Sequence, residues 1–419
     1  MILLIIVYFG LLSSFVRARI KDDISKLFAG AFLLYWFVTF AMSSFDPYGF
    51  NHVSFSTYLI LFLNVLTFIF GFTSYRFSNV ITDKDLNIEN LVKSKVYKLV
   101  VIIGIVFVMS LVTTKQSVMA YNSYDTSLFR ADFFEVLFQG NAFLLYGYYL
   151  FLYPLYFFLM SIVAYCLFFY RDWKVILMAL IYVVLFMSLS EGRLQYMNFA
   201  LVLLFDFWLY KSKNKGFKIG KSVKILGIIG VISLYMMMAY TTQMRLGKNS
   251  IGEGVKDLNE TFVTYSIAPF RAFDYAMNND YIEKAGGYKL GRASICGFDF
   301  LVSSLLKRVG IKYVSVRTDT NDYLQNNAIS VGNDHTVNYS YTNAMYHYYD
   351  FGILGIIIIP FIFGYFCRHV IHLFCNFNTI YLHAACTFLF FVVMHMVFSW
   401  YFNKLFAIPY LLFLMLKKK

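Results

Sequence analysis

Residues 351–366, with the sequence FGILGIIIIPFIFGYF, are apolar except where glycines and one proline interrupt them. A transmembrane β-strand alternates apolar and polar residues over about ten positions, and this stretch does not alternate. Continuous apolarity over this length instead predicts a helix that crosses a membrane. Similar stretches recur along the chain on the N-terminal and C-terminal sides of this one.

The composition extends this prediction to the whole chain. Of 419 residues, 60% are hydrophobic and 14% are charged, whereas soluble domains carry about 25% charged residues. A water-soluble fold of this length could not hide so much apolar surface. The five prolines are few enough for long helices.

We therefore expect an all-α fold, a polytopic transmembrane bundle of about eleven helices within a range of ten to twelve. The predicted spans are 2–16, 27–44, 55–73, 97–113, 147–169, 175–189, 194–210, 225–241, 351–367, 378–399 and 401–416. They divide the chain into residues 1–241 with helices 1–8, a long loop 242–350, and residues 351–419 with helices 9–11. The segment 142–170 is long enough to tilt or to break at Pro154.

The basic residues predict the orientation of the spans. Six lysines lie in 211–224, three end the chain at 417–419, and Lys or Arg also enriches alternate short loops. Because such loops face the cytoplasm, we expect the N-terminus outside, the C-terminus inside and the loop 242–350 outside. The net charge of +13 then reflects orientation and contact with membrane lipids, and no nucleic-acid partner is expected.

The sequence predicts no disulfide, metal or cofactor. Cys296 is the only cysteine in the external segment 242–350, so it has no partner there. No Cys/His cluster has the spacing of a zinc site, and no nucleotide-binding motif occurs in a supporting context.

The first half of the external segment has the spacing of amphipathic helices. Val255, Leu258, Phe262 and Tyr265 form one apolar stripe, and we expect Pro269 to restart the chain. A later stripe, 298–309, ends at Gly310, a helix stop. The expected structure is a cap of short amphipathic helices on the outer membrane face.

Three arginines at the predicted outer face are candidates for binding a lipid-linked pyrophosphate: Arg193, Arg245 and Arg271. A guanidinium offers a planar fork of donors that matches phosphate oxygens, and it keeps its charge. The alternative is that these arginines reach lipid head groups or pair with Glu191 and Asp274.

The stretch 321–350 is rich in Asn and Tyr, which suit sugar recognition by stacking and by paired hydrogen bonds. The candidate sugar-binding residues are Tyr339, Tyr341, Asn343 and Tyr348. The alternative is a solvated loop with asparagine turns and interfacial tyrosines.

Four titratable residues could remove a proton from an acceptor hydroxyl: Asp274, His335, His347 and Asp350. A histidine in such a loop more often has a structural role. Asp46, in Phe45-Asp46-Pro47-Tyr48-Gly49, is typical of a turn.

Four local stretches carry a resemblance to a known family. They are the Asp46-Pro47 turn before the span 55–72, the pair Gly192-Arg193, Arg245 with the run 265–274, and Tyr348–Gly352 followed by Gly355. With the architecture, they resemble the Wzy family, the bacterial polymerases of O-antigen and capsule repeat units. Some members carry Gly eleven residues after an Arg; here Leu204, Lys256 and Ile282 stand at those positions.

The resemblance implies an inner-membrane glycosyltransferase with a fold like the C superfamily of lipid-linked-sugar transferases. The implied reaction transfers a growing glycan from undecaprenyl pyrophosphate to the next lipid-linked repeat unit, without a metal. The implied partners are a flippase and a chain-length regulator. A glycan ligase and a flippase or transporter are the alternatives, followed by a receptor or assembly protein.

Overall fold

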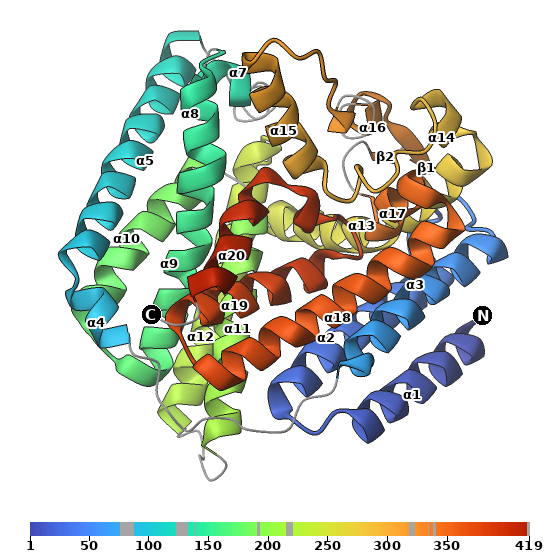
Figure 1. Ribbon diagram of the computed structural model, residues 1–419, viewed down its shortest axis with the longest axis horizontal. Helices are drawn as coiled ribbons and strands as arrows, with labels where there is room; N and C mark the ends of the chain where they lie inside the picture. The colour runs from blue at the N-terminus through green and yellow to red at the C-terminus, as the bar shows by residue number, and fades with distance from the viewer. Residues whose placement is uncertain are drawn as a thin grey trace. The chain divides into compact units, whose positions relative to one another are not determined.

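The computed structural model describes residues 1–75, 88–122, 133–138, 140–190, 193–214, 221–317, 323–333, 335–337 and 341–416. Within these ranges the secondary structure is helical apart from one two-stranded hairpin (Figure 1). The chain forms two compact units. The first comprises 1–82, 262–377 and 389–415, and the second comprises 83–261, 378–388 and 416–419. This grouping joins segments that lie together in space, whereas the three consecutive segments expected from hydropathy follow the order of the chain and stay a prediction.

The first unit combines helices from both ends of the chain with the hairpin. Its elements are α1 (Ile2–Arg19), α2 (Asp23–Phe45), α3 (Phe55–Ser74), α14 (Tyr281–Lys284), α15 (Cys296–Arg308), α16 (Tyr323–Asn326), β1 (Ile329–Gly332), β2 (His335–Val337), α17 (Asn343–Phe351), α18 (Ile353–Phe377) and α20 (Ile408–Phe413).

Helices α3 and α18 lie side by side and form the most extensive helix pair (Figure 1). Glycine makes their close approach possible. A Cβ at Gly71 would lie 1.9 Å from the Phe361 carbonyl oxygen, and a Cβ at Gly364 would lie 2.2 Å from the Phe68 carbonyl oxygen. The Thr67 hydroxyl also donates to the Ile356 carbonyl across the pair at 3.0 Å. Small residues and a hydroxyl are common means of joining helices in lipid.

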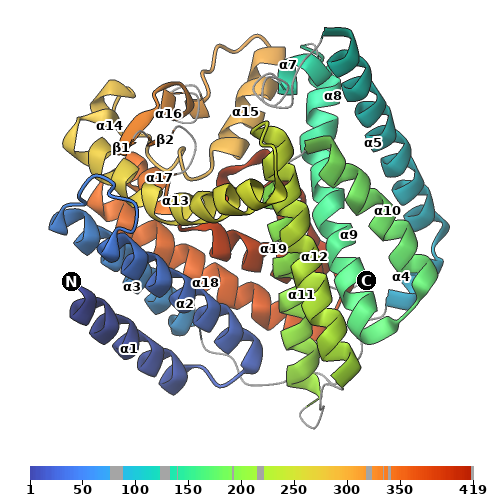
Figure 2. The same ribbon diagram turned by 180° about the vertical axis from the view of Figure 1, so that it is seen from behind.

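The second unit is helical, and Figure 2 shows α9 beside α11. Its elements are α4 (Ile88–Lys93), α5 (Lys95–Asn122), α7 (Phe133–Phe138), α8 (Ala142–Gly147), α9 (Tyr153–Tyr165), α10 (Trp173–Ser190), α11 (Arg193–Lys213) and α12 (Lys221–Arg245). Helices α13 (Ile251–Asn278) and α19 (Ile380–His395) belong in part to each unit.

Six described helices are long and apolar enough to cross a membrane, which confirms a helical protein with several membrane-spanning candidates. They are Ile2–Arg19, Asp23–Phe45, Phe55–Ser74, Lys95–Ala120, Ala142–Tyr170 and Ile353–Phe377. Ala142–Tyr170 stays continuous past Pro154, because a π-helical turn, Tyr148–Leu152, directly precedes α9. Trp173–Leu189 and Ile380–His395 are apolar but shorter.

Residues 401–416, predicted as one span, do not form a single helix. Two 3₁₀ turns, Tyr401–Asn403 and Leu405–Ala407, precede the six-residue α20. Helix α19 ends at His395, and the non-helical residue Trp400 precedes the first turn; its indole N–H donates to the Ser294 carbonyl at 2.8 Å. This tertiary bond has no signature in hydropathy.

The expected restart at Pro269 is wrong, because α13 runs through this residue as one helix of 28 residues. A proline inside a helix costs about 3 kcal/mol. Its neighbours Ile267, Ala268 and Phe270 are fully buried, and burial of large side chains stabilises by about 1.5–3 kcal/mol each. Packing therefore offsets the local preference.

The segment 242–350 was expected to form a cap of short amphipathic helices, but it also contains the hairpin. The expected stripe 298–309 does form α15, and this helix ends just before Gly310 (φ +82°).

Candidate functional site

The turn between α2 and α3 provides the first polar group of the candidate site. Asp46 adopts a left-handed conformation (φ +46°), and its Oδ1 accepts the Phe50 N–H at 3.0 Å. The Gly49 N–H points back to the Asp46 carbonyl at 3.5 Å, and Gly49 has φ +67°. The predicted turn is therefore confirmed, and local side-chain chemistry explains it.

The hairpin holds this turn from the other side. The Asn51 N–H donates to the Val331 carbonyl at 2.7 Å, and the Asn333 amide donates to the Tyr48 carbonyl at 2.8 Å. A Cβ at Gly332 would lie 2.6 Å from the Asn51 nitrogen, so this position requires glycine. The turn 46–51 and the strands β1 and β2 are far apart in the sequence, and together they form one small polar layer. This layer lies at the C-terminal end of α2 and the N-terminal end of α3.

Arg271 extends from α13 to the C-terminal end of α2. Its Nη1 donates to the Ser43 hydroxyl at 2.6 Å and its Nη2 to the Ser43 carbonyl at 3.0 Å. In a continuing helix this carbonyl would accept from residue 47, but Pro47 has no N–H. The guanidinium supplies the missing donor and places positive charge at the negative end of the α2 dipole.

Arg271 is buried, with 4% of its surface exposed. Burial lowers the pKa of its guanidinium, whereas Tyr58, Asp46 and Asp274 act in the opposite direction. Nη2 lies 3.4 Å from Asp46 Oδ1, and the guanidinium lies 5.7 Å from the centre of the Phe50 ring. Its Nε is buried and has no hydrogen-bond partner among the residues that the structure describes. A buried donor of this kind is costly, and it marks a position where a ligand atom could bind.

Asp274 lies one helical turn after Arg271 and contacts the start of α3. Its Oδ1 accepts from the Ser54 N–H at 3.1 Å, from the Ser54 hydroxyl, and from the Thr57 hydroxyl at 2.7 Å. Ser54 is the N-cap of α3. The carboxylate therefore stabilises a helix N-terminus, where unpaired N–H groups and the dipole favour negative charge.

His335 adjoins the same layer from β2. Its ring meets the Phe50 ring edge-on, with 5.3 Å between the centres. The side chain is half-buried. The structure thus brings Arg271, Asp274 and His335 of the predicted site residues into one region, together with Asp46.

His347 and Asn343 form a second, fully buried polar cluster. The Asn343 amide exchanges hydrogen bonds of 3.2 Å with Asn64 on α3, and it donates to His347 Nε2 at 3.1 Å. His347 Nδ1 lies 3.2 Å from the Ser294 hydroxyl. Burial lowers the pKa of His347 to about 3, so the imidazole is neutral at pH 7.

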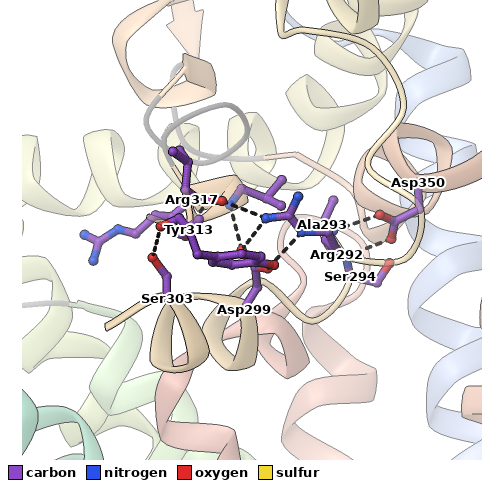
Figure 3. A network of polar contacts seen from close by, with 11 residues as sticks. Arg292, Ala293, Ser294, Asp299, Ser303, Tyr313, Arg317 and Asp350 are labelled. Carbon is purple, nitrogen blue, oxygen red and sulfur yellow. Dashed lines mark hydrogen bonds and ion pairs between the residues drawn. The ribbon is translucent and has the colours of Figure 1, made fainter. Parts of the chain in front are cut away.

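Asp350 fastens the loop before α15. Its two carboxylate oxygens accept the N–H groups of Ala293 and Ser294, each at 2.8 Å (Figure 3). Burial raises the pKa of Asp350, and the hydrogen bonds from Ser294, Ala293 and Gly291 oppose that rise. Asp350 and His347 are both completely buried, so their positions favour a structural role and do not support the prediction that either is the base.

The predicted sugar-binding residues do not form one open face. Tyr341 is buried, and its hydroxyl donates to the Leu324 carbonyl at 3.2 Å. Asn343 is buried as well, so the structure exposes neither side chain for contact with a sugar, and their role in sugar binding stays a prediction. Tyr348 is half-buried and meets the Phe273 ring edge-on. Tyr339 lies outside the described residues.

Two predicted arginines have described backbones but no described side chains. Arg193 begins α11 and Arg245 ends α12. Their proposed phosphate contacts fall outside the described part of the chain, as does Glu191.

The sequence reasoning missed a further polar cluster around Asp299 (Figure 3). Asp299 accepts from Arg292 Nε at 2.9 Å, from the Tyr313 hydroxyl at 2.5 Å and from the Val316 N–H at 2.6 Å. Burial alone would raise the pKa of Asp299, but these hydrogen bonds outweigh it and lower the pKa. The cluster joins the segment after α15 to the helix itself. The sequence did not predict the pair of Arg292 and Asp299. Their spacing of seven residues indicates a shared helix face only within one helix, and here a loop separates them.

In comparisons with known proteins, no family model, curated protein or solved structure matches the chain significantly.

Proposed function

We propose that the protein is an inner-membrane glycosyltransferase that joins undecaprenyl-pyrophosphate-linked repeat units into O-antigen or capsular polysaccharide. Its architecture in this proposal is similar to that of the C superfamily of lipid-linked-sugar transferases. The observation that carries the proposal is Arg271, a buried guanidinium at the junction of two apolar helices, whose Nε has no hydrogen-bond partner in the described ranges. A pyrophosphate oxygen at Nε would complete its hydrogen bonds and would develop charge as the lipid carrier departs.

His335 is the proposed base. His347 and Asp350 are completely buried, and Asp274 Oδ1 already accepts three hydrogen bonds. His335 is half-buried in the same layer as Arg271, and an imidazole nitrogen can act as a general base. In this proposal Asp46 keeps Arg271 oriented.

The test begins with deletion of the gene and electrophoresis of the surface polysaccharide. Single-repeat products support a polymerase. Loss from the surface with accumulated lipid-linked chains supports a ligase, and intermediates trapped on the inner leaflet support a flippase.

Complementation with variants then tests Arg271 itself. Arg271→Lys keeps a positive charge but loses the donor fork, so we expect single-repeat products. Arg292→Lys is the matched control, because Arg292 also lies in the segment 242–350 but its side chain is 39% exposed and pairs with Asp299. Immunoblots of the membrane fraction must show equal amounts of protein. Normal chain lengths from Arg271→Lys would contradict the phosphate assignment.

A further inference from the structure

The buried face of α11 carries three polar side chains. Gln195, Asn198 and Asp206 lie three and eight residues apart, which places them on one side of a helix together with Val202. All four are buried, and Asn198 and Asp206 are completely so. Such a face is unusual in a chain of this hydropathy, because polar groups inside a membrane bundle are costly and are commonly functional.

Several polar atoms on this face have no hydrogen-bond partner within the described part of the chain. They are Gln195 Oε1, both amide atoms of Asn198, and Asp206 Oδ2. Buried polar atoms are nearly always hydrogen-bonded, and in polar interiors water supplies the missing bonds. The rise of a helix separates Asn198 from Asp206 by about 12 Å, which about four hydrogen-bonded waters could bridge.

Asp206 pairs with His383 of α19 within the second unit. His383 Nε2 lies 2.6 Å from Asp206 Oδ1, and both side chains are completely buried. Tyr165 packs its ring edge-on against His383, with 5.4 Å between the centres, and Phe205 covers another side. Among the described residues, the other titratable group that interacts electrostatically with Asp206 is the Cys166 thiol.

Charge balance determines what this pair can do. A carboxylate with a neutral imidazole would leave one net negative charge in a low-dielectric interior. Binding one proton makes the pair neutral, either as carboxylate and imidazolium or as carboxylic acid and imidazole. No other charged partner for Asp206 occurs in the described part of the chain.

We propose that Asp206 and His383 form a proton-binding pair inside the bundle, and that water reaches it along the face of α11 that carries Asn198 and Gln195. The bound proton resides on Asp206 Oδ2, while the His383 Nε2–H donates to Asp206 Oδ1, and release of the proton leaves the pair with one negative charge. This site is separate in sequence and in residues from the proposed glycan site, so either proposal can fail without the other.

Infrared difference spectroscopy of the full-length protein in phosphatidylglycerol-containing vesicles tests the pair. Acidification should produce a carboxylic-acid band that is missing in Asp206→Asn. In His383→Gln the band should titrate at higher pH, because the carboxylate has lost its partner. Thr387→Val is the control, because Thr387 lies one turn from His383 and, among the described residues, its hydroxyl donates only within its own helix, to the His383 carbonyl.

Exchange into D₂O tests the route. The Asp206 band should shift rapidly in the wild type and at least about tenfold more slowly in Asn198→Leu, where the intervening polar step is gone. Equal exchange in both proteins would overturn the route. Identical difference spectra for wild type and Asp206→Asn would overturn the pair. If Asp206→Asn does not fold, an unshifted titration in His383→Gln, or the lack of any titrating carboxyl band in the wild type, overturns it instead.

Discussion

Arg271 and Asp274 lie one turn apart on α13 and stabilise opposite ends of two different helices. Arg271 donates to the Ser43 carbonyl at the end of α2, and Asp274 accepts from the Ser54 N–H at the start of α3. Each charge therefore matches the helix dipole that it meets. Since residues three apart share a helix face, one helix fixes the direction of the α2–α3 connection with two side chains.

This arrangement predicts different effects for two substitutions of Asp274. Asp274→Ala removes the acceptor of three donors and should destabilise the protein by about 1–2 kcal/mol, as the loss of a helix cap does. Asp274→Asn keeps one acceptor oxygen and should cost less. Denaturant unfolding in micelles measures both. If Asp274 instead acts as the catalytic base, Asp274→Asn would abolish chain growth while the stability stays near that of the wild type.

The contact between α3 and α18 predicts a strong effect at Gly71. A Cβ there would collide with the Phe361 carbonyl oxygen, so Gly71→Ala should lower stability by about 1–3 kcal/mol as the helices separate. Gly30→Ala is the matched control in α2, because nothing lies within 4 Å of its added Cβ. That control should be neutral or stabilising by up to about 1 kcal/mol. Thermal unfolding that ranks the two variants equally would contradict the close approach.

Buried His347 predicts a loss of stability in mild acid. Its pKa falls from 6.5 to about 3 in the folded state, so the unfolded chain binds a proton first as the pH decreases. The contribution to stability is complete above pH 6.5 and is lost progressively down to about pH 3, by on the order of a few kcal/mol. We expect His347→Gln to be less stable at pH 7 but to show a shallower decline on acidification. Parallel pH profiles of unfolding for the two proteins would count against this assignment.

Asp299 predicts a change at lower pH. Its folded-state pKa lies below 3.8, so its contribution to stability is present above pH 3.8 and is lost as the pH falls through the folded-state value. Asp299→Asn removes the charge at every pH and should weaken the cluster by about 1–3 kcal/mol. Hydrogen exchange of the Val316 amide, which donates to Asp299, reports this directly. The amide should exchange faster in the variant at neutral pH, and unchanged exchange would disagree with the role assigned to Asp299.

Features set by neighbouring residues could be predicted from the sequence. The turn at Asp46 and the helix stop at Gly310 follow from local backbone chemistry, and long apolar runs predict helices. The predicted restart at Pro269 is wrong because a prediction from neighbouring residues cannot include the tertiary packing that buries Phe270, the residue after the proline.

Pairings between distant residues could not be predicted. Arg271 meets Ser43 across 228 positions, and His383 meets Asp206 across 177. Hydropathy identifies each segment but not its partner. For the same reason, the sequence could not predict that Tyr341 and Asn343 are buried, although tyrosine and asparagine are residue types that suit a sugar site. The hairpin was not predicted because its strands have only four and three residues, too few for the alternation seen in β1 to indicate a strand.

The bond between Asn64 and Asn343 has a consequence for biosynthesis. The two residues are 279 positions apart, and ribosomes add about 5–20 residues per second. Helix α3 therefore enters the bilayer roughly 15–60 s before its amide partner has been made. During that interval the Asn64 amide either faces lipid without its partner or is shielded by an insertion factor. We therefore expect quality control to act mainly on the partly synthesised chain.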